Sequence, residues 1–567
     1  MPRKILASFV FCSLLALAAV FFAGCDYHAA TSADRGGNAD DDDNDNDNDN
    51  DNDDATPDRT WWRGVVFQEI YIRSYQDSNG DGIGDFPGLI SHLPYLAELG
   101  VGGVWLMPMY PTPFFDSGYD VADYEAINPD YGTMNDFQTF LAEAHKLGIK
   151  VFIDGVFNHT SWDHAWFKES HASRANPKRD WYEWADKPLW DCGGAGAQFG
   201  SSRWQWDATT QQYYYHRFLV QQPDLNWANP DVLAAIEDVL RFWFDMGVDG
   251  FRLDAVGAYY ESPIICDNAP QTHAILQAFR TVADEYPDRA FVAEADGDFD
   301  QWLQFFGNGT DEMHMAFNFN LTYGLYAAFY SQDSFPISML MASSYARLPP
   351  GGQQAVFVNN HDFFRYYDLL FRDERRSKLA GVVELTLPGT PFIYYGEEIG
   401  LADGDHVVID YRDFARTPMA WDATAEAGFT TGKPWLPLSW NHATNNVALE
   451  GADPQSLLQH FRKMIAIRNA SDALRFGDYR EVESFDSSVF AFFRTTDREI
   501  VMVVINLSHL AQQFYLNLSL SPWDGSAGDV HDLYADADVQ QLTLANTNMY
   551  PGSLPPFGFE ILKLEAN

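Results

Sequence analysis

The chain has 567 residues, of which 46% are hydrophobic and 16% aromatic, enough apolar material for an enzyme-sized core with smaller accessory parts. Its formal net charge of -45 argues against nucleic acid and anionic lipid surfaces as partners, because both would repel it. An uncharged substrate is compatible with this charge.

The first residues predict an export signal followed by a lipid attachment site. Arg3 and Lys4 precede the apolar run 5–22, which has the length of a secretory signal and is too short for a stable membrane span. The run ends in Phe-Ala-Gly-Cys, which resembles the processing sequence of bacterial lipoproteins. We therefore expect residues 1–24 to be removed and Cys25 to carry a lipid that anchors the exported protein to a bacterial membrane or cell surface. A plain secretory signal is the alternative.

Residues 25–59 predict a disordered linker. The tract 40–54 contains only Asp and Asn, so it cannot bury enough apolar surface to fold by itself. A calcium-binding repeat is the alternative, but the Gly and apolar positions of such repeats are missing.

Beyond Cys25, the mature chain contains only Cys192 and Cys266. In an oxidising compartment these two thiols could form a disulfide. Two buried free thiols are the alternative, and the sequence does not decide between them.

From residue 60, short apolar runs alternate with amphipathic segments, which predicts strand–helix units around a parallel sheet. Strands are expected at 65–71, 104–107, 151–157, 248–253, 290–293, 355–358 and 391–394, with helices at 89–99, 134–147 and 230–246. The predicted fold is an α/β (β/α)8 TIM barrel over residues 60–158 and 223–468. Residues 159–222 form an inserted domain B after the third strand, and residues 469–567 an antiparallel β-sandwich.

Polar residues follow the expected strands at the points where they end. Each one alone is more often a helix cap or a turn former. Four such clusters in order indicate a site instead, because the carboxyl ends of barrel strands share one face. The clusters are Asp154 with Asn158 and His159, Arg252 with Asp254, Glu294, and Asn360 with His361 and Asp362.

At these positions the chain resembles the α-amylase family, glycoside hydrolase family 13. The motifs are residues 154–159 (Asp-Gly-Val-Phe-Asn-His), 250–255 (Gly-Phe-Arg-Leu-Asp-Ala), 292–294 (Val-Ala-Glu) and 357–362 (Phe-Val-Asn-Asn-His-Asp). The resemblance implies that the nucleophile is Asp254, the general acid/base Glu294 and the transition-state stabiliser Asp362. It also implies that the sugar next to the cleaved bond is held by Arg252, His159 and His361.

Retaining hydrolysis of a glycoside requires these groups. One ionised carboxylate attacks the anomeric carbon and one protonated carboxyl releases the leaving oxygen, about 5 Å away. Arg252 lies two residues before Asp254 on a strand, so both point to one face and the arginine can keep the carboxylate ionised. The neighbouring carboxylates are expected to raise the pKa of Glu294.

Residues 118–120 (Gly-Tyr-Asp) look like the sugar platform of the family. The resemblance implies that Tyr119 stacks on the terminal glucose and that Asp120 bonds a distal hydroxyl group. It further implies that Arg416 pairs with this aspartate, as in exo-acting relatives. The alternative is a purely structural tyrosine and ion pair.

Residues 77–85 predict a calcium loop, and Ca²⁺ is the one cofactor expected. Oxygen-bearing residues alternate around a tight glycine turn, as a hard cation requires, and the spacing resembles a calcium loop of the family. The expected ligands are Asp77, Asn79, Asp81, the carbonyl of Ile83, and Asp85. A turn rich in Asp and Asn without metal is the alternative.

The sequence leaves the subfamily open. Residues 222–226 (Gln-Pro-Asp-Leu-Asn) resemble a motif of the oligo-1,6-glucosidase side of the family, which includes α-glucosidases, trehalose synthases and an intermediate group of α-amylases. Ala255 favours α-1,4 bonds, whereas residues 306–317 look more like trehalose synthase. Because export suits a polymer-degrading enzyme, we favour a monomeric α-amylase acting on starch or maltooligosaccharides.

An exo-acting α-glucosidase or oligo-1,6-glucosidase is the second reading and a trehalose synthase the third. A catalytically inactive sugar-binding protein belongs to a different class. Such proteins usually lose a catalytic carboxylate, and here all three are present.

Overall fold

The computed structural model describes residues 60–189, 202–263, 265–405, 407–408, 411–519, 522, 528–539, 541–543 and 545–566. All of them belong to one compact unit, residues 58–567. The predicted signal and linker, with Cys25, lie outside the described residues, as does Cys192. Within the described segments, no helix has both the length and the apolar character needed to cross a membrane.

Eight parallel strands form a closed barrel in the order β1-β11-β10-β9-β8-β7-β3-β2, which confirms the predicted fold class. Seven of them overlap the predicted strands, and the three-residue strand β9 was not predicted. The strands are β1 (Phe67–Ile70), β2 (Gly103–Leu106), β3 (Lys150–Gly155), β7 (Gly250–Leu253), β8 (Ala290–Ala293), β9 (Met315–Phe317), β10 (Gln353–Val356) and β11 (Thr390–Tyr394).

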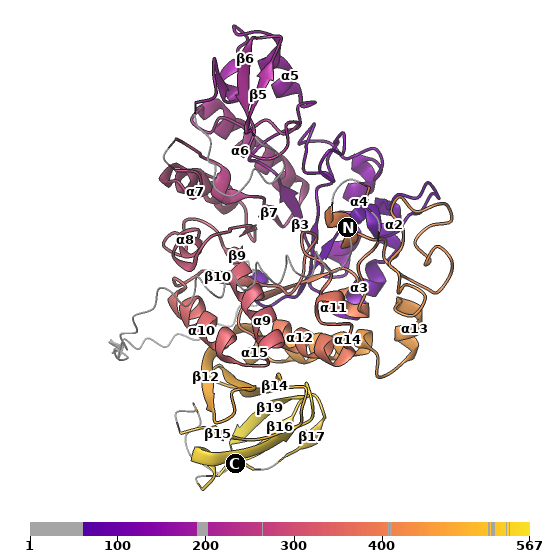
Figure 1. Ribbon diagram of the computed structural model, residues 1–567, viewed down its shortest axis with the longest axis vertical. Helices are drawn as coiled ribbons and strands as arrows, with labels where there is room; N and C mark the ends of the chain where they lie inside the picture. Colours follow the sequence, from indigo (N-terminus) through magenta and orange to yellow (C-terminus); the bar gives the residue numbers. More distant parts are fainter. Residues whose placement is uncertain are drawn as a thin grey trace, which may run out of the picture. The chain divides into compact units, whose positions relative to one another are not determined.

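Helices surround the strands (Figure 1). The segment predicted as one helix at 89–99 is two helices that meet at His92, because Pro94 lies in the first turn of the second and has no N–H to continue the first. The helices named here are α2 (Phe86–Ser91), α3 (Leu93–Leu99), α4 (Met134–Lys146), α6 (Pro230–Met246), α7 (Pro270–Asp284), α9 (Phe319–Ser331), α10 (Phe335–Ser343), α12 (Glu374–Thr386) and α14 (Leu457–Ala470).

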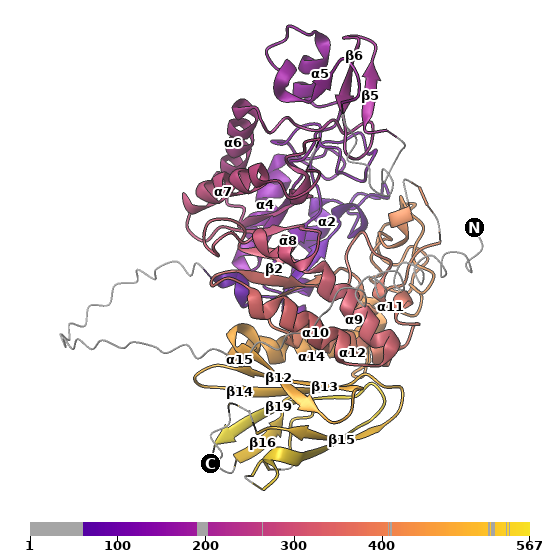
Figure 2. The same cartoon turned by 60° about the vertical axis from the view of Figure 1, so that its left-hand side comes forward.

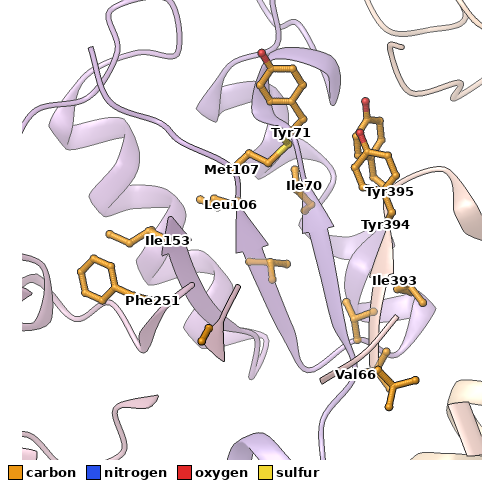
Figure 3. Packing of buried hydrophobic residues seen from close by; sticks show 14 of the residues in the cluster. Val66, Ile70, Tyr71, Leu106, Met107, Ile153, Phe251, Ile393, Tyr394 and Tyr395 are labelled. Carbon is orange, nitrogen blue, oxygen red and sulfur yellow. The ribbon is translucent and has the colours of Figure 1, made fainter. Parts of the chain in front are cut away.

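Alternate residues of each barrel strand face opposite sides. One set contributes to the main core between strands and helices, and Figure 3 shows members of it, among them Ile70, Leu106, Ile153 and Phe251. The other set forms a separate buried cluster that includes Phe67, Trp105, Phe152, Val292, Phe317 and Phe392.

This second cluster fills the inside of the barrel. The rings of Trp105 on β2 and Phe317 on β9 are 5.5 Å apart, although their strands are not neighbours in the barrel order, so they meet across the interior. Phe67 and Phe392 stack at 4.6 Å. The barrel therefore has a solid aromatic floor.

The inserted domain after β3 contains a helix and a small antiparallel sheet. The helix is α5 (Ala165–Ala172), and the sheet has the order β4 (Trp184–Ala185), β6 (Gln212–Tyr215) and β5 (Trp204–Asp207). Isolated bridges join His159 to Asp224 and Tyr182 to Leu225, and so hold the two ends of the insertion together.

The C-terminal domain is an antiparallel eight-stranded sheet in the order β17-β16-β19-β14-β13-β12-β15-β18. Its strands are β12 (Asp478–Ser484), β13 (Val489–Thr495), β14 (Ile500–Asn506), β15 (Gln512–Asn517), β16 (Gly528–Asp532), β17 (Ala537–Asp538), β18 (Tyr550–Leu554) and β19 (Phe559–Ala566). The first strands lie beside the barrel helices (Figure 2), where Arg494 donates a 2.7 Å hydrogen bond to the carbonyl of Thr386 at the end of α12.

Candidate active site

A cavity of about 330 Å³ opens beyond the carboxyl ends of the barrel strands, where barrel enzymes carry their functional groups. All three predicted catalytic carboxylates line it. The lining residues are Asp116, Tyr119, His159, Arg217, Phe218, Asp254, Ala255, Gly257, Ala258, Asp267, Glu294, Asp296, Phe319, Tyr323, His361, Asp362, Phe363 and Arg412.

The two-residue period of the strands places the polar groups directly above the aromatic floor. Glu69 follows Phe67 at this spacing, Asp154 follows Phe152, and Glu294 follows Val292. The apolar layer below and the polar layer above therefore come from the same inward faces.

Arg252 is the central cation of this layer and is only 2% exposed. Its guanidinium lies 2.6 Å from the carboxylate of Asp254 and 2.7 Å from that of Glu294. A third carboxylate, that of Asp154, lies at 3.0 Å. The predicted pairing of Arg252 with Asp254 is thus present in the structure.

Burial raises the pKa values of the two central carboxyl groups. The pKa of Glu294 rises to about 8, because desolvation and the charges of Asp254 and Asp362 outweigh Arg252. That of Asp254 rises to about 6, with desolvation again the largest cause and Arg252 opposing it. At neutral pH the pair therefore holds one proton, on Glu294.

The carboxyl groups of Asp254 and Glu294 are neighbours, because both contact the Arg252 guanidinium, at 2.6 Å and 2.7 Å. Inverting glycosidases separate their carboxyls by roughly 6.5–9.5 Å to admit a water molecule, and retaining enzymes do not. Ala255 has a left-handed backbone (φ 46°), and its N–H donates to Glu294 at 2.9 Å. This turn fixes the second carboxyl beside the first.

The pKa of Asp362 is lowered, in contrast to the raised pKa values of Asp254 and Glu294. Burial acts to raise its pKa, but His361 and the guanidinium groups of Arg412 and Arg416 hold it well below the usual value. Arg416 Nη2 donates to Asp362 at 3.1 Å and Arg412 Nη1 at 3.3 Å. Asp362 is therefore a permanently ionised acceptor in the cavity.

A hydrogen-bonded chain runs from Glu69 through His361 and Tyr119 to Asp154. Burial raises the pKa of Glu69 well above its usual value and lowers that of His361, and the Glu69 carboxyl is hydrogen-bonded to His361 Nδ1 at 2.5 Å. The imidazole Nε2–H then donates to the hydroxyl of Tyr119 at 2.9 Å, and that hydroxyl donates to Asp154 at 2.9 Å. Sequence reasoning missed Glu69, whose signal was its place two residues after Phe67.

Tyr119 and His159 line the cavity as predicted. The Tyr119 ring stacks on the His361 ring, with centroids 5.4 Å apart and planes at 13°. His159 Nε2 lies 2.9 Å from the Tyr119 carbonyl, and burial lowers the pKa of this histidine to about 4. His159 is therefore a neutral donor at physiological pH.

The prediction that Asp120 contacts sugar and pairs with Arg416 is wrong. Asp120 has no exposed surface, and its carboxylate accepts the backbone N–H groups of Phe115 and Asp116 at 3.0 Å each. Arg416 is also fully buried and supports Asp362 instead, as described above.

The pair that lines the cavity is Asp116 and Arg412. The guanidinium of Arg412 bonds both Asp116 and Asp362, so it bridges the loop after β2 to the loop after β10. The sequence signal was a second aspartate, Asp116, which lies three residues before Tyr119.

The loop 77–85 holds its side-chain oxygens in successive Asx turns. Asp77 accepts from the backbone N–H groups of Asn79, Gly80 and Gly82, and Asp81 accepts from that of Ile83. Across the described segments, no three His, Cys, Asp or Glu side chains converge as a metal site. A cation here would therefore also need the Asn79 amide oxygen and the Ile83 carbonyl.

Cys266 is disulfide-bonded and follows β7 in the segment that borders the cavity. This excludes the free thiol that was one of its two predicted states. Cys192, the predicted partner, lies outside the described residues.

Residues 69–477 match the family described as "Alpha amylase, catalytic domain". A probable alpha-glucosidase of Rhizobium meliloti (strain 1021) is 37% identical over 527 residues, covering 83% of this chain and 93% of the relative. The trehalose synthase/amylase TreS of Mycolicibacterium smegmatis is 37% identical over 526 residues, covering 82% and 87%. The solved structure of the trehalulose synthase MutB from Pseudomonas mesoacidophila MX-45 is 32% identical with a TM-score of 0.77, covering 89% and 99%.

Proposed function

Because the chain belongs to the α-amylase family of glycosidases, we propose that it is an exo-acting α-glucosidase that removes glucose from short α-glucosides with retention. The bridge of Arg412 to Asp116 and Asp362 carries this proposal, because it ties together two loops that line the cavity. We infer that this bridge closes the cavity beyond the first sugar, so that one terminal sugar is admitted and a longer chain is stopped. The volume of about 330 Å³ is near the lower limit of about 300–1,000 Å³ for small-molecule sites and suits a disaccharide.

In the proposed mechanism, Asp254 attacks the anomeric carbon while Glu294 gives its proton to the leaving oxygen. The covalent glucosyl-enzyme is then opened by a water molecule, whose proton goes to Glu294. Arg252 keeps Asp254 ionised in the free enzyme, and Asp362 accepts hydrogen bonds from sugar hydroxyls. Tyr119, His159 and His361 form the wall against which this first sugar lies.

Trehalose-forming isomerisation is the second candidate. It uses the same covalent intermediate, with the released glucose attacking in place of water. The similarity to TreS, equal in identity to that of the alpha-glucosidase, supports it. Starch hydrolysis, the reading that the sequence favoured, has less support, because the relatives are named for α-glucosidase and trehalose synthase activity more than for starch hydrolysis alone.

The product profile on maltose, trehalose and soluble starch tests the proposal. We expect maltose to give α-glucose first, seen by the anomeric signals in NMR, and starch to be degraded slowly and only to glucose. Asp254→Asn, which keeps the shape but removes the nucleophile, should be inactive on all three. Early mixed maltooligosaccharides from starch would contradict exo action.

We also propose that Ca²⁺ binds in loop 77–85 and that Cys25 carries a lipid. The alternation of Asp77, Asn79 and Asp81 supports the first, and the residues before Cys25 the second. Intact mass spectrometry of the protein from a bacterial host tests the lipid, with Cys25→Ser as the control. An unmodified thiol on a chain that begins at residue 25 or later would contradict it.

A further inference from the structure

One wall of the cavity is built from two segments that are far apart in the sequence. Arg217 and Phe218 follow β6 in the inserted domain, whereas Gly257, Ala258 and Asp267 belong to the connection between β7 and α7. These residues take no part in the proposed covalent mechanism.

Arg217 joins the two segments. Its Nη1 donates to the carboxylate of Glu261 and, at 2.8 Å, to the carbonyl oxygen of Cys266, while its Nη2 donates to Asp267. The Glu261 side chain is only 4% exposed, and the hydroxyl of Tyr215 also donates to it. Because moving Arg217 would leave the buried Glu261 carboxylate without this ion pair, the arginine is held in place.

The guanidinium group still has donors to offer. It carries five N–H bonds. The contacts above use both on Nη1 and one on Nη2. Among the residues that the structure describes, no protein group accepts from Nε–H or from the second Nη2–H. The Arg217 side chain is 19% exposed and lines the cavity, so these donors are available to a ligand.

The Arg217 wall is on the side of the leaving group. Glu294, which protonates the leaving oxygen, accepts the Ala255 N–H at the start of the β7–α7 connection. Further along this connection, the Asn268 N–H donates to the Gly257 carbonyl at 2.8 Å, which places Asp267, the residue before Asn268 and a partner of Arg217, on the same wall.

We propose that Arg217 binds hydroxyl groups of the second sugar, the one that leaves in the first half-reaction. This rests on the proposed function. A second sugar held there can return: its hydroxyl oxygen bonds to the anomeric carbon, the ester bond to Asp254 breaks, and the hydroxyl proton goes to Glu294. Arg217 therefore sets the fraction of the glucosyl-enzyme that is transferred to sugar rather than to water.

Two substrates can distinguish the binding of the second sugar by Arg217 from the chemistry at the first sugar. Maltose has a second sugar, whereas α-glucosyl fluoride presents the same first sugar with a fluoride leaving group. For Arg217→Ala we expect kcat/KM for maltose to fall about 10- to 100-fold, the loss of hydrogen bonds to a charged donor. We expect kcat/KM for α-glucosyl fluoride to change less than threefold. With α-glucosyl fluoride as donor and glucose added as acceptor, the ratio of disaccharide formed to fluoride released should fall about tenfold.

Two further variants test whether the effect is merely structural. Arg217→Lys keeps the charge opposite Glu261 but loses the planar fork, so it should fold and show an intermediate defect of the same pattern. Arg203→Ala removes another guanidinium, 3.9 Å from Glu261, that does not line the cavity, and should leave both substrates and the product ratio unchanged.

The outcomes are distinct. Equal losses on maltose and α-glucosyl fluoride in Arg217→Ala and Arg217→Lys, or a wild-type enzyme that forms no disaccharide at high glucose, would overturn the role of Arg217. Failure of the wild type to act on either substrate would instead overturn the proposed function itself.

Discussion

Replacing Glu294 with Gln should separate acid catalysis from binding. Glutamine has the same shape and keeps an oxygen for the Ala255 N–H, which donates at 2.9 Å in the wild type. It cannot give a proton to the leaving oxygen. General acid catalysis contributes about 10²- to 10⁴-fold, so kcat/KM for maltose should fall by this factor. Fluoride leaves without a proton, so kcat/KM for α-glucosyl fluoride should fall less than about tenfold.

The pH profile gives a second readout of the same change. Wild-type activity needs Asp254 ionised and Glu294 protonated, so kcat/KM should rise as pH passes about 6 and fall as it passes about 8. In Glu294→Gln, measured with α-glucosyl fluoride, the alkaline fall should disappear and the acid rise should remain. Equal losses on both substrates, or an alkaline limb that survives the substitution, would refute the assignment of Glu294 as the acid.

Three other changes can be tested. Arg412→Ala should lower kcat/KM for maltose about 10- to 100-fold and let maltose appear before maltotriose among the early products from maltotetraose; early products of glucose and maltotriose alone would contradict this. Chelation should lower the melting temperature by several degrees and Ca²⁺, but not Mg²⁺, should restore it, unless loop 77–85 binds no metal. Glu384 and Glu397 are buried carboxyl groups that repel each other when ionised, and burial raises both pKa values, that of Glu397 to about 8. Because the folded state then binds more protons than the unfolded state, stability should fall as pH rises from about 5 to 8, and Glu384→Gln should flatten the fall in the melting temperature; an unchanged slope would contradict these raised pKa values.

The barrel could be predicted from the sequence because strand–helix alternation and buried β-rich runs are local patterns. Helix α6 was predicted with its exact bounds, since Asn229 caps its start and Gly247, with φ 105°, ends it. Strand β9 was missed because three residues are too few to show a period. The break at His92 was missed because an amphipathic pattern continues across it.

The sequence predicted the polar groups at each single strand end, but not the contacts between loops that are far apart in the chain. Asp254 directly follows the strand that carries Arg252, and their contact follows from the geometry of this strand end. The error at Asp120 arose because two aspartates three residues apart both follow β2, and the sequence does not show which one the loop buries. The bridge between Asp116 and Arg412 joins positions almost 300 residues apart, and no local pattern predicts such a pair.

The aromatic floor inside the barrel lies beneath the cavity. Trp105, Phe317 and Phe392 pack against one another there, and Arg412 bridges two of the loops around the cavity. In the proposed mechanism, the water that completes hydrolysis is therefore expected to enter on the side from which the released sugar departs. Water and the released sugar then compete for the same space. The residence time of the released sugar there sets whether the enzyme hydrolyses its substrate or isomerises it.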